Sequence, residues 1–229
     1  MNRLQKGVLQ RMTNMLSHIL TRRRALRHSI DVEKNFAQWE ESCVPSYVHR
    51  NFLAAFVSWQ RLFVAARLAE VTNRSCRRVL DFGSSVGELS HILKTQTEYN
   101  FIESDDTSAE FLIKHNPRAK RTTINSADIG GYDAIFAIDS LEHNENYDEL
   151  IEILVKLLSP GGNLIISGPT ENALYRMGRR IAGFTGEYHH TTIFDIEAAV
   201  AKRMTLLAER TVPFGLPLFR ITVWNTQGS

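Results

Sequence analysis

One stretch of the chain decides its fold, and it reads Arg78-Val79-Leu80-Asp81-Phe82-Gly83-Ser84-Ser85-Val86-Gly87-Glu88-Leu89-Ser90. Val79, Leu80 and Phe82 form a short apolar run that is typical of a buried parallel strand. The residues after this run predict a turn and then a helix over residues 86–95. A strand, turn and helix in this order form the junction at which doubly wound α/β folds hold nucleotide-like cofactors.

The two glycines of the turn indicate close approach of the backbone to a ligand. Gly83 and Gly87 lack Cβ, so the chain can bend sharply there. The N–H groups of the helix that follows would face back over the turn. Asp81 would repel a pyrophosphate but suits a cofactor that carries an ammonium group. The spacing also lacks the third glycine of the dinucleotide pattern. A structural turn without a ligand is the alternative interpretation.

Composition sets the broad class of the protein. The chain has 229 residues, 43% hydrophobic and 23% charged, which suits one full core with an added segment. We expect a basic and aromatic-rich helical extension or cap over residues 1–75 and a cofactor-binding domain over residues 76–229. The two cysteines have neither metal-ligand nor disulfide spacing, so we expect no metal and a reducing, cytoplasmic location. No uncharged apolar run of about 18 residues predicts a membrane span, and no secretory signal is expected.

Charge is distributed unevenly along the chain. Residues 1–30 contain seven basic side chains and no acid, whereas the remainder carries a net charge of −5. Apolar residues recur at helical spacing in this arm, namely Leu4, Val8, Met12, Met15, Leu16, Ile19 and Leu20. The arm is therefore interpreted as an amphipathic basic helix. It could lie on an anionic membrane, serve as a transit peptide, bind nucleic acid, or pack on its own domain or a partner subunit.

The middle and end of the chain indicate an α/β sheet. Residues 31–73 are aromatic-rich and predict two helices separated by Pro45, which form either ordinary core or a cap over the cofactor cleft. From residue 78 onward, strands predicted at 78–82, 99–104, 120–124, 132–138 and 162–168 alternate with helices at 86–95, 108–115, 146–158 and 192–203. This order predicts a parallel sheet with helices on both faces. Two strands at 204–212 and 218–225, with no helix between them, close it.

Four motifs together resemble the class I S-adenosylmethionine-dependent methyltransferases, small-molecule type. The segment from Asp81 to Gly87 resembles the family's Asp/Glu-x-Gly-x-Gly-x-Gly, with Ser85 where glycine is usual. The others are Asp106-Thr107-Ser108-Ala109-Glu110-Phe111-Leu112, Leu141-Glu142-His143 after a strand, and Leu158-Ser159-Pro160-Gly161-Gly162. They occur in the family's order and span residues 78–225. The resemblance implies a doubly wound, seven-stranded, mostly parallel Rossmann-like sheet with an N-terminal helical extension.

The resemblance also implies a cofactor, S-adenosyl-L-methionine, and the residues that hold it. They are Asp81, Gly83, Ser85, Gly87, Asp106, Asp128 and Asp139. Ser85 fits this role if its backbone is not forced to positive φ. Asp106 is the acid expected to accept the ribose hydroxyls, and Glu103 and Asp105 remain alternatives. The backbone N–H groups of residues 125–128, or the Asp128 carboxylate, are expected near the adenine edge. A solvated acidic loop is the structural alternative for residues 103–106.

An insertion after the predicted strand 162–168 carries the candidate substrate residues. Tyr175, Arg176, Arg179, Arg180 and Tyr188 suit a phosphate or carboxylate on the substrate. His189, His190 and His143 are candidate general bases. A helical lid with a solvated basic face and a structural histidine pair is the alternative interpretation.

These features together predict a methyltransferase that acts on a small or lipid-linked acceptor by O- or C-methylation. No nucleic-acid partner is expected, whereas peripheral membrane contact through residues 1–30 is. The rival functions are a Rossmann-type oxidoreductase and a non-catalytic, cofactor-binding or membrane-associated scaffold.

Overall fold

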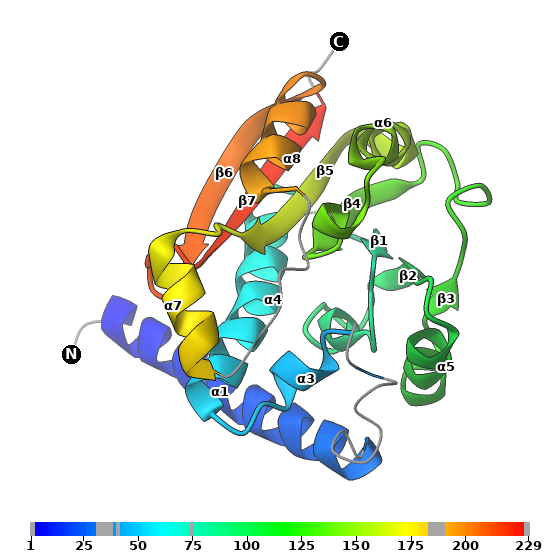
Figure 1. The fold of residues 1–229 in the computed structure, drawn as a ribbon. Helices are drawn as coiled ribbons and strands as arrows, with labels where there is room; N and C mark the ends of the chain where they lie inside the picture. Colours follow the sequence, from blue (N-terminus) through cyan, green and yellow to red (C-terminus); the bar gives the residue numbers. More distant parts are fainter. Residues whose placement is uncertain (1–2, 31–38, 40–41, 74–75, 183–190, 227–229) are drawn as a thin grey trace. The chain divides into compact units, whose positions relative to one another are not determined.

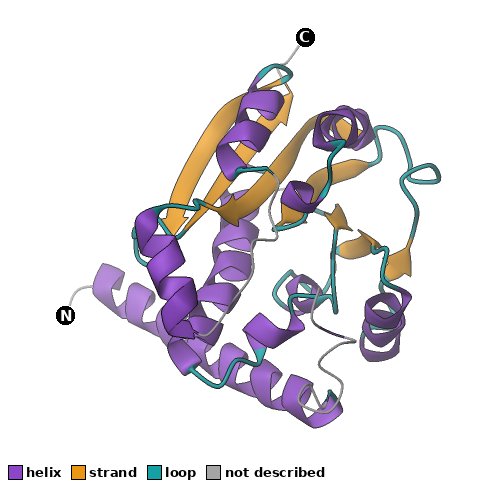
Figure 2. Cartoon of the chain, in the orientation of Figure 1, coloured by secondary structure: helices purple, strands orange, loops and turns teal. Residues whose placement is uncertain are grey.

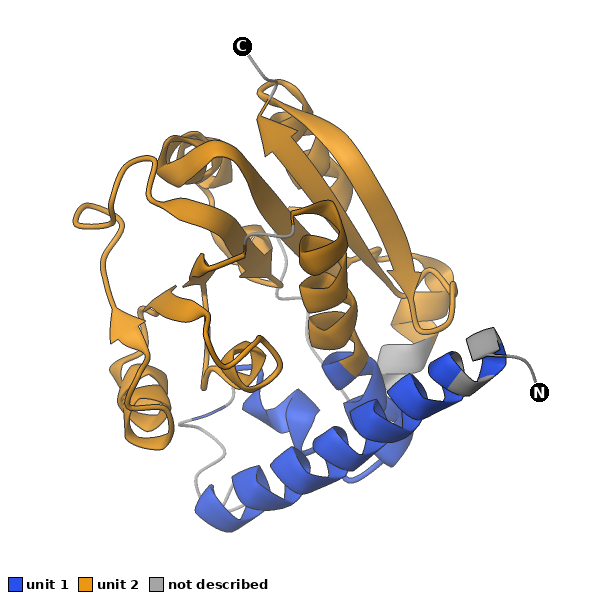
Figure 3. Ribbon diagram, turned by 180° about the vertical axis from the view of Figure 1, so that it is seen from behind, with its two compact units in different colours: residues 1–59 blue, residues 60–229 orange. Residues whose placement is uncertain are grey.

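The computed structural model describes residues 3–30, 39, 42–73, 76–182 and 191–226. The chain divides into two compact units, residues 1–59 and residues 60–229 (Figure 3). The division falls inside helix α4, Phe52–Thr72. The functional division expected between residues 75 and 76 stays a prediction.

The first unit contains the basic arm as one long helix, α1, Arg3–Ser29, followed by the short helix α3, Val44–Tyr47. The arm was expected to be helical, and this is confirmed. Two of its arginines are used within the unit. Arg27 donates to the carbonyl oxygen of Val48 at 3.1 and 2.9 Å, and Arg23 donates to that of His49. Because these carbonyls follow α3 and have no partner inside that helix, the two guanidinium groups fix the end of α3.

Helix α4 is long and apolar enough to cross a membrane by length and composition alone. However, 56% of its apolar window is buried inside the protein. Near the middle of this helix, Arg61 is 5% exposed and forms an ion pair with Asp139. A helix in a protein core has the same length and composition. A charged side chain buried in a protein interior needs an ionic partner, and Asp139 is the partner of Arg61.

The second unit is built on a seven-stranded sheet (Figures 1 and 2). Its strands are β1 Arg78–Phe82, β2 Glu98–Ile102, β3 Lys120–Arg121, β4 Tyr132–Ile138, β5 Leu158–Pro169, β6 Met204–Val212 and β7 Phe219–Thr226. The order is β3-β2-β1-β4-β5-β7-β6, and only β7 runs antiparallel to its neighbours. The expected mostly parallel sheet with a closing strand pair is confirmed.

Helices between the strands bury the apolar faces of the sheet. They are α5 Asp106–His115, α6 Tyr147–Leu157, α7 Ala173–Ala182 and α8 Ile193–Ala201, with short 3-10 helices η1 Glu88–His91 and η2 Leu141–His143. Leu154 of α6 and Val200 of α8 are fully buried with Ile135 and Leu164 of the sheet. Burying such side chains contributes roughly 1.5–3 kcal/mol each.

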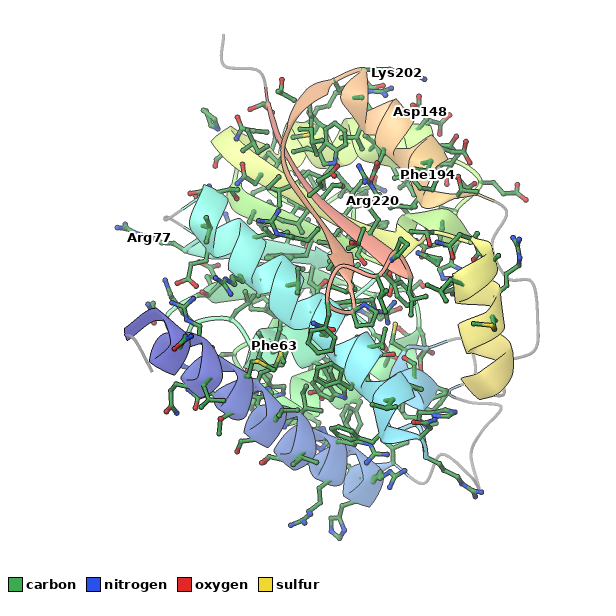
Figure 4. The ribbon with its side chains drawn as sticks, turned by 90° about the vertical axis from the view of Figure 1, so that its left-hand side faces the viewer. Phe63, Arg77, Asp148, Phe194, Lys202 and Arg220 are labelled. Carbon is green, nitrogen blue, oxygen red and sulfur yellow. The ribbon has the colours of Figure 1, made fainter. Side chains whose placement is uncertain are left out.

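Side-chain contacts tie the outer helices together, and Figure 4 labels four residues that take part in them, Asp148, Lys202, Phe194 and Arg220. The Lys202 ammonium lies 3.9 Å from the Asp148 carboxylate, which links α8 to α6. The Arg220 guanidinium of β7 lies 6.0 Å from the centre of the Phe194 ring on α8. These contacts connect α8 to α6 and to β7.

The helix predicted over residues 86–95 is wrong, because only the four-residue 3-10 helix η1 forms there. Gly87 has φ +77° and therefore cannot belong to a right-handed helix. The Ser90 hydroxyl donates to the Gly87 carbonyl at 2.7 Å, and the Ser90 N–H donates to the same oxygen at 3.0 Å. Both bonds occupy the Gly87 carbonyl oxygen, which in an α-helix would accept from the N–H of residue 91.

Candidate cofactor and substrate site

The glycine turn follows β1 and is required by the packing of the fold itself. Gly83 has φ +73°, and a Cβ there would lie 2.5 Å from the Cβ of Ser140. Gly87 has φ +77°, and a Cβ there would lie 2.4 Å from Cγ of Leu112. The sequence indicated room for a ligand at Gly83. The structure shows that this glycine brings the ends of β1 and β4 together, and its contact with a cofactor stays a prediction.

Ser85 occupies a strained backbone position between the two glycines. Its φ is +49°, so the condition under which serine was expected to fit is not met. The residue is 7% exposed, and its hydroxyl has no hydrogen-bond partner in the described part of the chain. Its N–H donates to the Glu103 carboxylate at 2.6 Å. Strain together with an unpartnered buried hydroxyl is typical of a ligand-binding turn.

Three acids follow β2, and the structure gives each a different position. Asp105 caps α5, accepting from the N–H groups of Thr107 and Ser108. Asp106 has an 80% exposed side chain and pairs with Arg121 at 2.7 Å. Glu103 is half-buried and faces the glycine turn, where it accepts from the N–H of Ser85. The geometry thus brings Glu103 to the turn and leaves Asp106 on the surface, which favours the alternative over the expected ribose acid.

Asp81 lies beneath the turn, with only 3% of its surface exposed. Its carboxylate accepts a hydrogen bond from the Tyr99 hydroxyl. Burial raises the pKa of Asp81 to about 7, the nearby charge of Glu103 adds to this, and the Tyr99 hydrogen bond opposes it. The acid expected to meet an ammonium group is therefore already engaged by the protein.

Asp139 follows β4 in another strained conformation, with φ +51°. Its carboxylate accepts from the Ser167 hydroxyl at 3.1 Å and pairs with the Arg61 guanidinium. Arg61 also lies 4.1 Å from the centre of the Phe219 ring. These contacts connect α4, β4, β5 and β7 at the carboxyl ends of the parallel strands, where ligands bind in open α/β sheets.

The segment after Asp139 contains two buried polar side chains that the fold leaves unsatisfied. Ser140 is 8% exposed and Glu142 is 1% exposed. Among the residues that the structure describes, neither the Ser140 hydroxyl nor either Glu142 carboxylate oxygen has a hydrogen-bond partner. Burial raises the pKa of Glu142 to about 7, Arg61 opposes this rise, and Glu171 adds to it. His143, the neighbouring base candidate, is exposed on η2.

Asp128 is not brought to this site. It forms an ion pair with Arg78, the first residue of β1, whereas Gly83 follows the last. Five strand residues span roughly 16 Å. The expected adenine contact through the Asp128 side chain is therefore not supported by the geometry, because this side chain lies at the opposite edge of the sheet.

The substrate candidates after β5 are described only in part. Tyr175 on α7 is buried, and its ring packs edge-on against Phe219 at 5.2 Å. Arg176 is exposed and donates to the Glu171 carbonyl at 2.6 Å. The side chains of Arg179 and Arg180, and the residues Tyr188, His189 and His190, lie outside the described part of the chain. Their expected roles stay predictions.

Three residues near the carboxyl ends of β4 and β5 were not predicted from the sequence as site residues, namely Arg61, Ser140 and Glu142. Arg61 had a recognisable signal, because it is a cation in the middle of an apolar helix and so requires a buried partner. Glu142 was part of a quoted motif, but nothing in its sequence showed that its carboxylate lacks a partner. Within the described ranges, no group of three or more histidines, cysteines and acids could hold a metal ion.

Comparisons with known proteins identify the family. A family model described as "Methyltransferase domain" matches residues 49–203. No curated protein sequence matches the chain. Among solved structures, magnesium protoporphyrin IX methyltransferase from Synechocystis PCC 6803, solved with S-adenosylhomocysteine, has a TM-score of 0.62 at 17% identity and covers 85% of this chain and 95% of its own.

Two further structures have the same fold. N-methyltransferase NodS from Bradyrhizobium japonicum WM9, in complex with S-adenosylhomocysteine, has a TM-score of 0.59 at 15% identity and covers 74% and 87% of the two chains. The [4+2]-cyclase SpnF has a TM-score of 0.58 at 12% identity and covers 73% and 82%. The chain belongs to the methyltransferase-domain family, and its fold is that of the class I S-adenosylmethionine-dependent methyltransferases.

Proposed function

We propose that this methyltransferase transfers a methyl group from S-adenosylmethionine to a small or lipid-linked acceptor by O- or C-methylation. One observation carries the location of the site. The carboxyl ends of β1, β2 and β4 bring together a strained turn, a carboxylate that faces it, and buried hydroxyls without partners. Unsatisfied polar atoms of this kind are rare in folded proteins and call for a ligand.

The residues present fit the cofactor. Glu103 has two acceptor oxygens, which match the two hydroxyls of a ribose, and it already lies against the turn. The hydroxyls of Ser85 and Ser140 supply further polar groups at the ends of β1 and β4. When bound, S-adenosylmethionine supplies a methyl group on a positively charged sulfur, which a nucleophile can displace.

The chain's own task is to position the acceptor and remove its proton. The acceptor atom must be held about 3–3.5 Å from the methyl carbon, and such positioning supplies much of the rate enhancement. A hydroxyl or carbon acid also needs a base, for which His143, His189 and His190 are our candidates. Arg176, exposed beside the end of β5, supports an acceptor that carries a phosphate or carboxylate.

Two rival functions make different predictions. An oxidoreductase would bind a dinucleotide, but the glycine spacing and the antiparallel β7 favour the methyltransferase. The fold alone does not fix the reaction, since one structural neighbour is described as a cyclase. Turnover with labelled cofactor therefore has to be measured as well as binding.

The first experiment compares thermal shifts of the protein with S-adenosylhomocysteine and with NAD. A shift with S-adenosylhomocysteine alone supports the proposal, and a shift with NAD alone would replace it with the oxidoreductase. Calorimetry then compares Glu103→Gln with the matched surface variant Asp106→Asn. We expect Glu103→Gln to weaken S-adenosylhomocysteine binding about tenfold or more, because a charged acceptor is lost. Asp106→Asn should have little effect, and the reverse pattern would return the ribose role to Asp106.

We also propose that α1 contacts anionic membrane surfaces, which would place the protein in the cytoplasm at the membrane. Leu9, Met12 and Leu20 are exposed on this helix, as are Arg11 and Arg24. An exposed apolar group beside exposed cations suits the headgroup region. Arg23 and Arg27 are excluded from this role because they bind backbone carbonyls.

Liposome co-sedimentation tests this second proposal. Arg11→Gln with Arg24→Gln should lower binding to anionic vesicles, and added salt should do the same. The matched control replaces two exposed arginines of the second unit, Arg118 and Arg210, with glutamine. Equal sedimentation of all three proteins would refute membrane contact through α1.

A further inference from the structure

Glu142 is a buried carboxyl group that the fold leaves without a hydrogen-bond partner. It lies on η2, directly after β4, and is 1% exposed. Both carboxylate oxygens lack a hydrogen-bond partner among the described residues. A buried charge is costly unless it is paired, and a buried polar group without a partner is destabilising. A ligand that donates hydrogen bonds to this carboxylate would remove the cost of burying it.

The charges around Glu142 leave an excess of acid. Arg61 and Glu171 are the charged groups that influence its carboxyl most strongly. Arg61 already pairs with the Asp139 carboxylate and stacks on the ring of Phe219. Arg61 is thus already paired with one carboxylate, while the charge of Glu171 makes the surroundings of Glu142 more acidic. A cation brought in by a ligand would balance this corner.

The corner adjoins the proposed cofactor turn. Ser140, two residues before Glu142, packs so closely against Gly83 that a Cβ there would lie 2.5 Å from the serine Cβ. Asp81, another buried acid of this region, accepts a hydrogen bond from the Tyr99 hydroxyl, and the buried Glu88 and the half-buried Glu103 also lie at the turn. Among the described residues, Glu142 is a buried acid near the turn for which neither carboxylate oxygen has a hydrogen-bond partner.

We propose that Glu142 binds the primary ammonium group at the amino-acid end of S-adenosylmethionine and S-adenosylhomocysteine, an inference that rests on the proposed function. An ammonium group has three N–H donors and no acceptor, which complements a carboxylate with two unused oxygens. A charge-assisted bond of this type is among the stronger hydrogen bonds in proteins. The raised pKa of Glu142 agrees with this role, because a bound cation would restore the ionised form.

The test uses two probes that differ in the amino-acid end. S-adenosylhomocysteine carries the ammonium group, whereas 5′-methylthioadenosine keeps the adenosine and the thioether but lacks it. Calorimetry measures both with the wild-type protein, Glu142→Gln and the control Glu145→Gln, which makes the same change at an exposed position three residues away. We expect Glu142→Gln to weaken S-adenosylhomocysteine binding by 10- to 100-fold, roughly the value of a hydrogen bond to a charged group. Its affinity for 5′-methylthioadenosine, and both affinities of Glu145→Gln, should change less than about twofold.

Each other outcome overturns the inference. Unchanged S-adenosylhomocysteine affinity in Glu142→Gln would remove the ammonium role while leaving the proposed function intact. An equal loss of affinity for both probes would show that Glu142 maintains the structure of the whole site and does not bind the ammonium group specifically. Failure of the wild-type protein to bind either probe would refute the proposed function itself. If Glu142→Gln does not fold, Glu142→Asp keeps the charge but shortens its reach, and it should lose affinity for S-adenosylhomocysteine only.

Discussion

The two edges of the sheet differ in how completely the fold satisfies their polar groups. At the amino edge, the Asp133 carboxylate accepts from the N–H groups of Arg77 and Arg78 at 2.9 and 3.1 Å. Glu98 pairs with Lys120 at 2.9 Å and lies 3.5 Å from Arg78. The positive-φ positions near this edge are occupied by Gly130 and Gly161, for which this conformation carries little cost.

The carboxyl edge is built in the opposite way. All four non-glycine residues with positive φ in the described chain lie there, namely Ser85, Asp139, Glu171 and Phe214. The unpartnered buried oxygens of Ser140 and Glu142 lie there too, whereas Nε of Arg78 at the amino edge lacks a hydrogen bond but lies 3.5 Å from the Glu98 carboxylate. Strain and unsatisfied groups persist only where the surrounding structure imposes them, and they concentrate at functional sites. This difference agrees with our proposal that the carboxyl edge binds the ligand while the amino edge contributes to stability.

The largest effect should come from adding a methyl group at the carboxyl edge. Gly83→Ala combines a positive φ with a contact of 2.5 Å to Ser140, so we expect about 3 kcal/mol of destabilisation. Gly130→Ala has a similar φ of +66° but open space around its Cβ, so it should lose only about 1 kcal/mol. Chemical denaturation measures both. Equal losses would show that close packing at Gly83 is not what distinguishes the two edges.

Glu142→Gln should change how stability depends on pH. The pKa of Glu142 is raised from 4.5 to about 7 in the folded protein, so between these values the native state holds a proton that the unfolded chain releases. Stability should therefore fall as pH rises through this window, by up to about 3 kcal/mol from this residue. Glutamine removes that part of the fall. Asp81 titrates in the same direction in both proteins, so only the difference between wild type and variant is informative.

A substitution at the amino edge should affect stability but not binding. Asp133→Ala removes the acceptor of two backbone N–H groups, and we expect about 1–2 kcal/mol of destabilisation. S-adenosylhomocysteine affinity should stay within about twofold of wild type, as measured by calorimetry on the folded variant. A large loss of affinity would mean that the two edges are not functionally separate.

The smallest effect is expected at Ser85. Ser85→Gly relieves the positive φ and removes an unpartnered buried hydroxyl, so the protein without ligand should become more stable by about 1 kcal/mol. If the hydroxyl contacts the cofactor, the same change should weaken S-adenosylhomocysteine binding. Thermal denaturation with and without S-adenosylhomocysteine separates the two effects. A destabilised variant would show that the serine is not strained.

Sequence patterns predicted the sheet well because its strands are apolar runs bounded by turn residues. The strands over 78–82, 132–138 and 204–212 are found at those bounds. The helix after Gly87 was not predictable, because the Ser90 side chain competes with the backbone there. The position of the cofactor site at the carboxyl ends of the strands stays a prediction.

Individual site residues were harder to predict than the site. Glu103, Asp105 and Asp106 are chemically alike, and only the three-dimensional structure separates the cap and the surface ion pair from the acid that faces the turn. The ion pair of Asp128 with Arg78 could not be predicted because it joins residues 50 positions apart. The charge pattern of residues 1–30 likewise did not distinguish Arg23 and Arg27, which donate to backbone carbonyls, from the other arginines.

Hydrogen–deuterium exchange with and without S-adenosylhomocysteine tests most directly whether the carboxyl edge is the cofactor site. We expect the ligand to slow exchange in residues 83–88, 103–108 and 139–144, which follow β1, β2 and β4, and to leave residues 128–133 and 158–162 at the amino edge unchanged. Slowed exchange confined to the amino edge, or no change at either edge while calorimetry shows binding, would contradict this assignment.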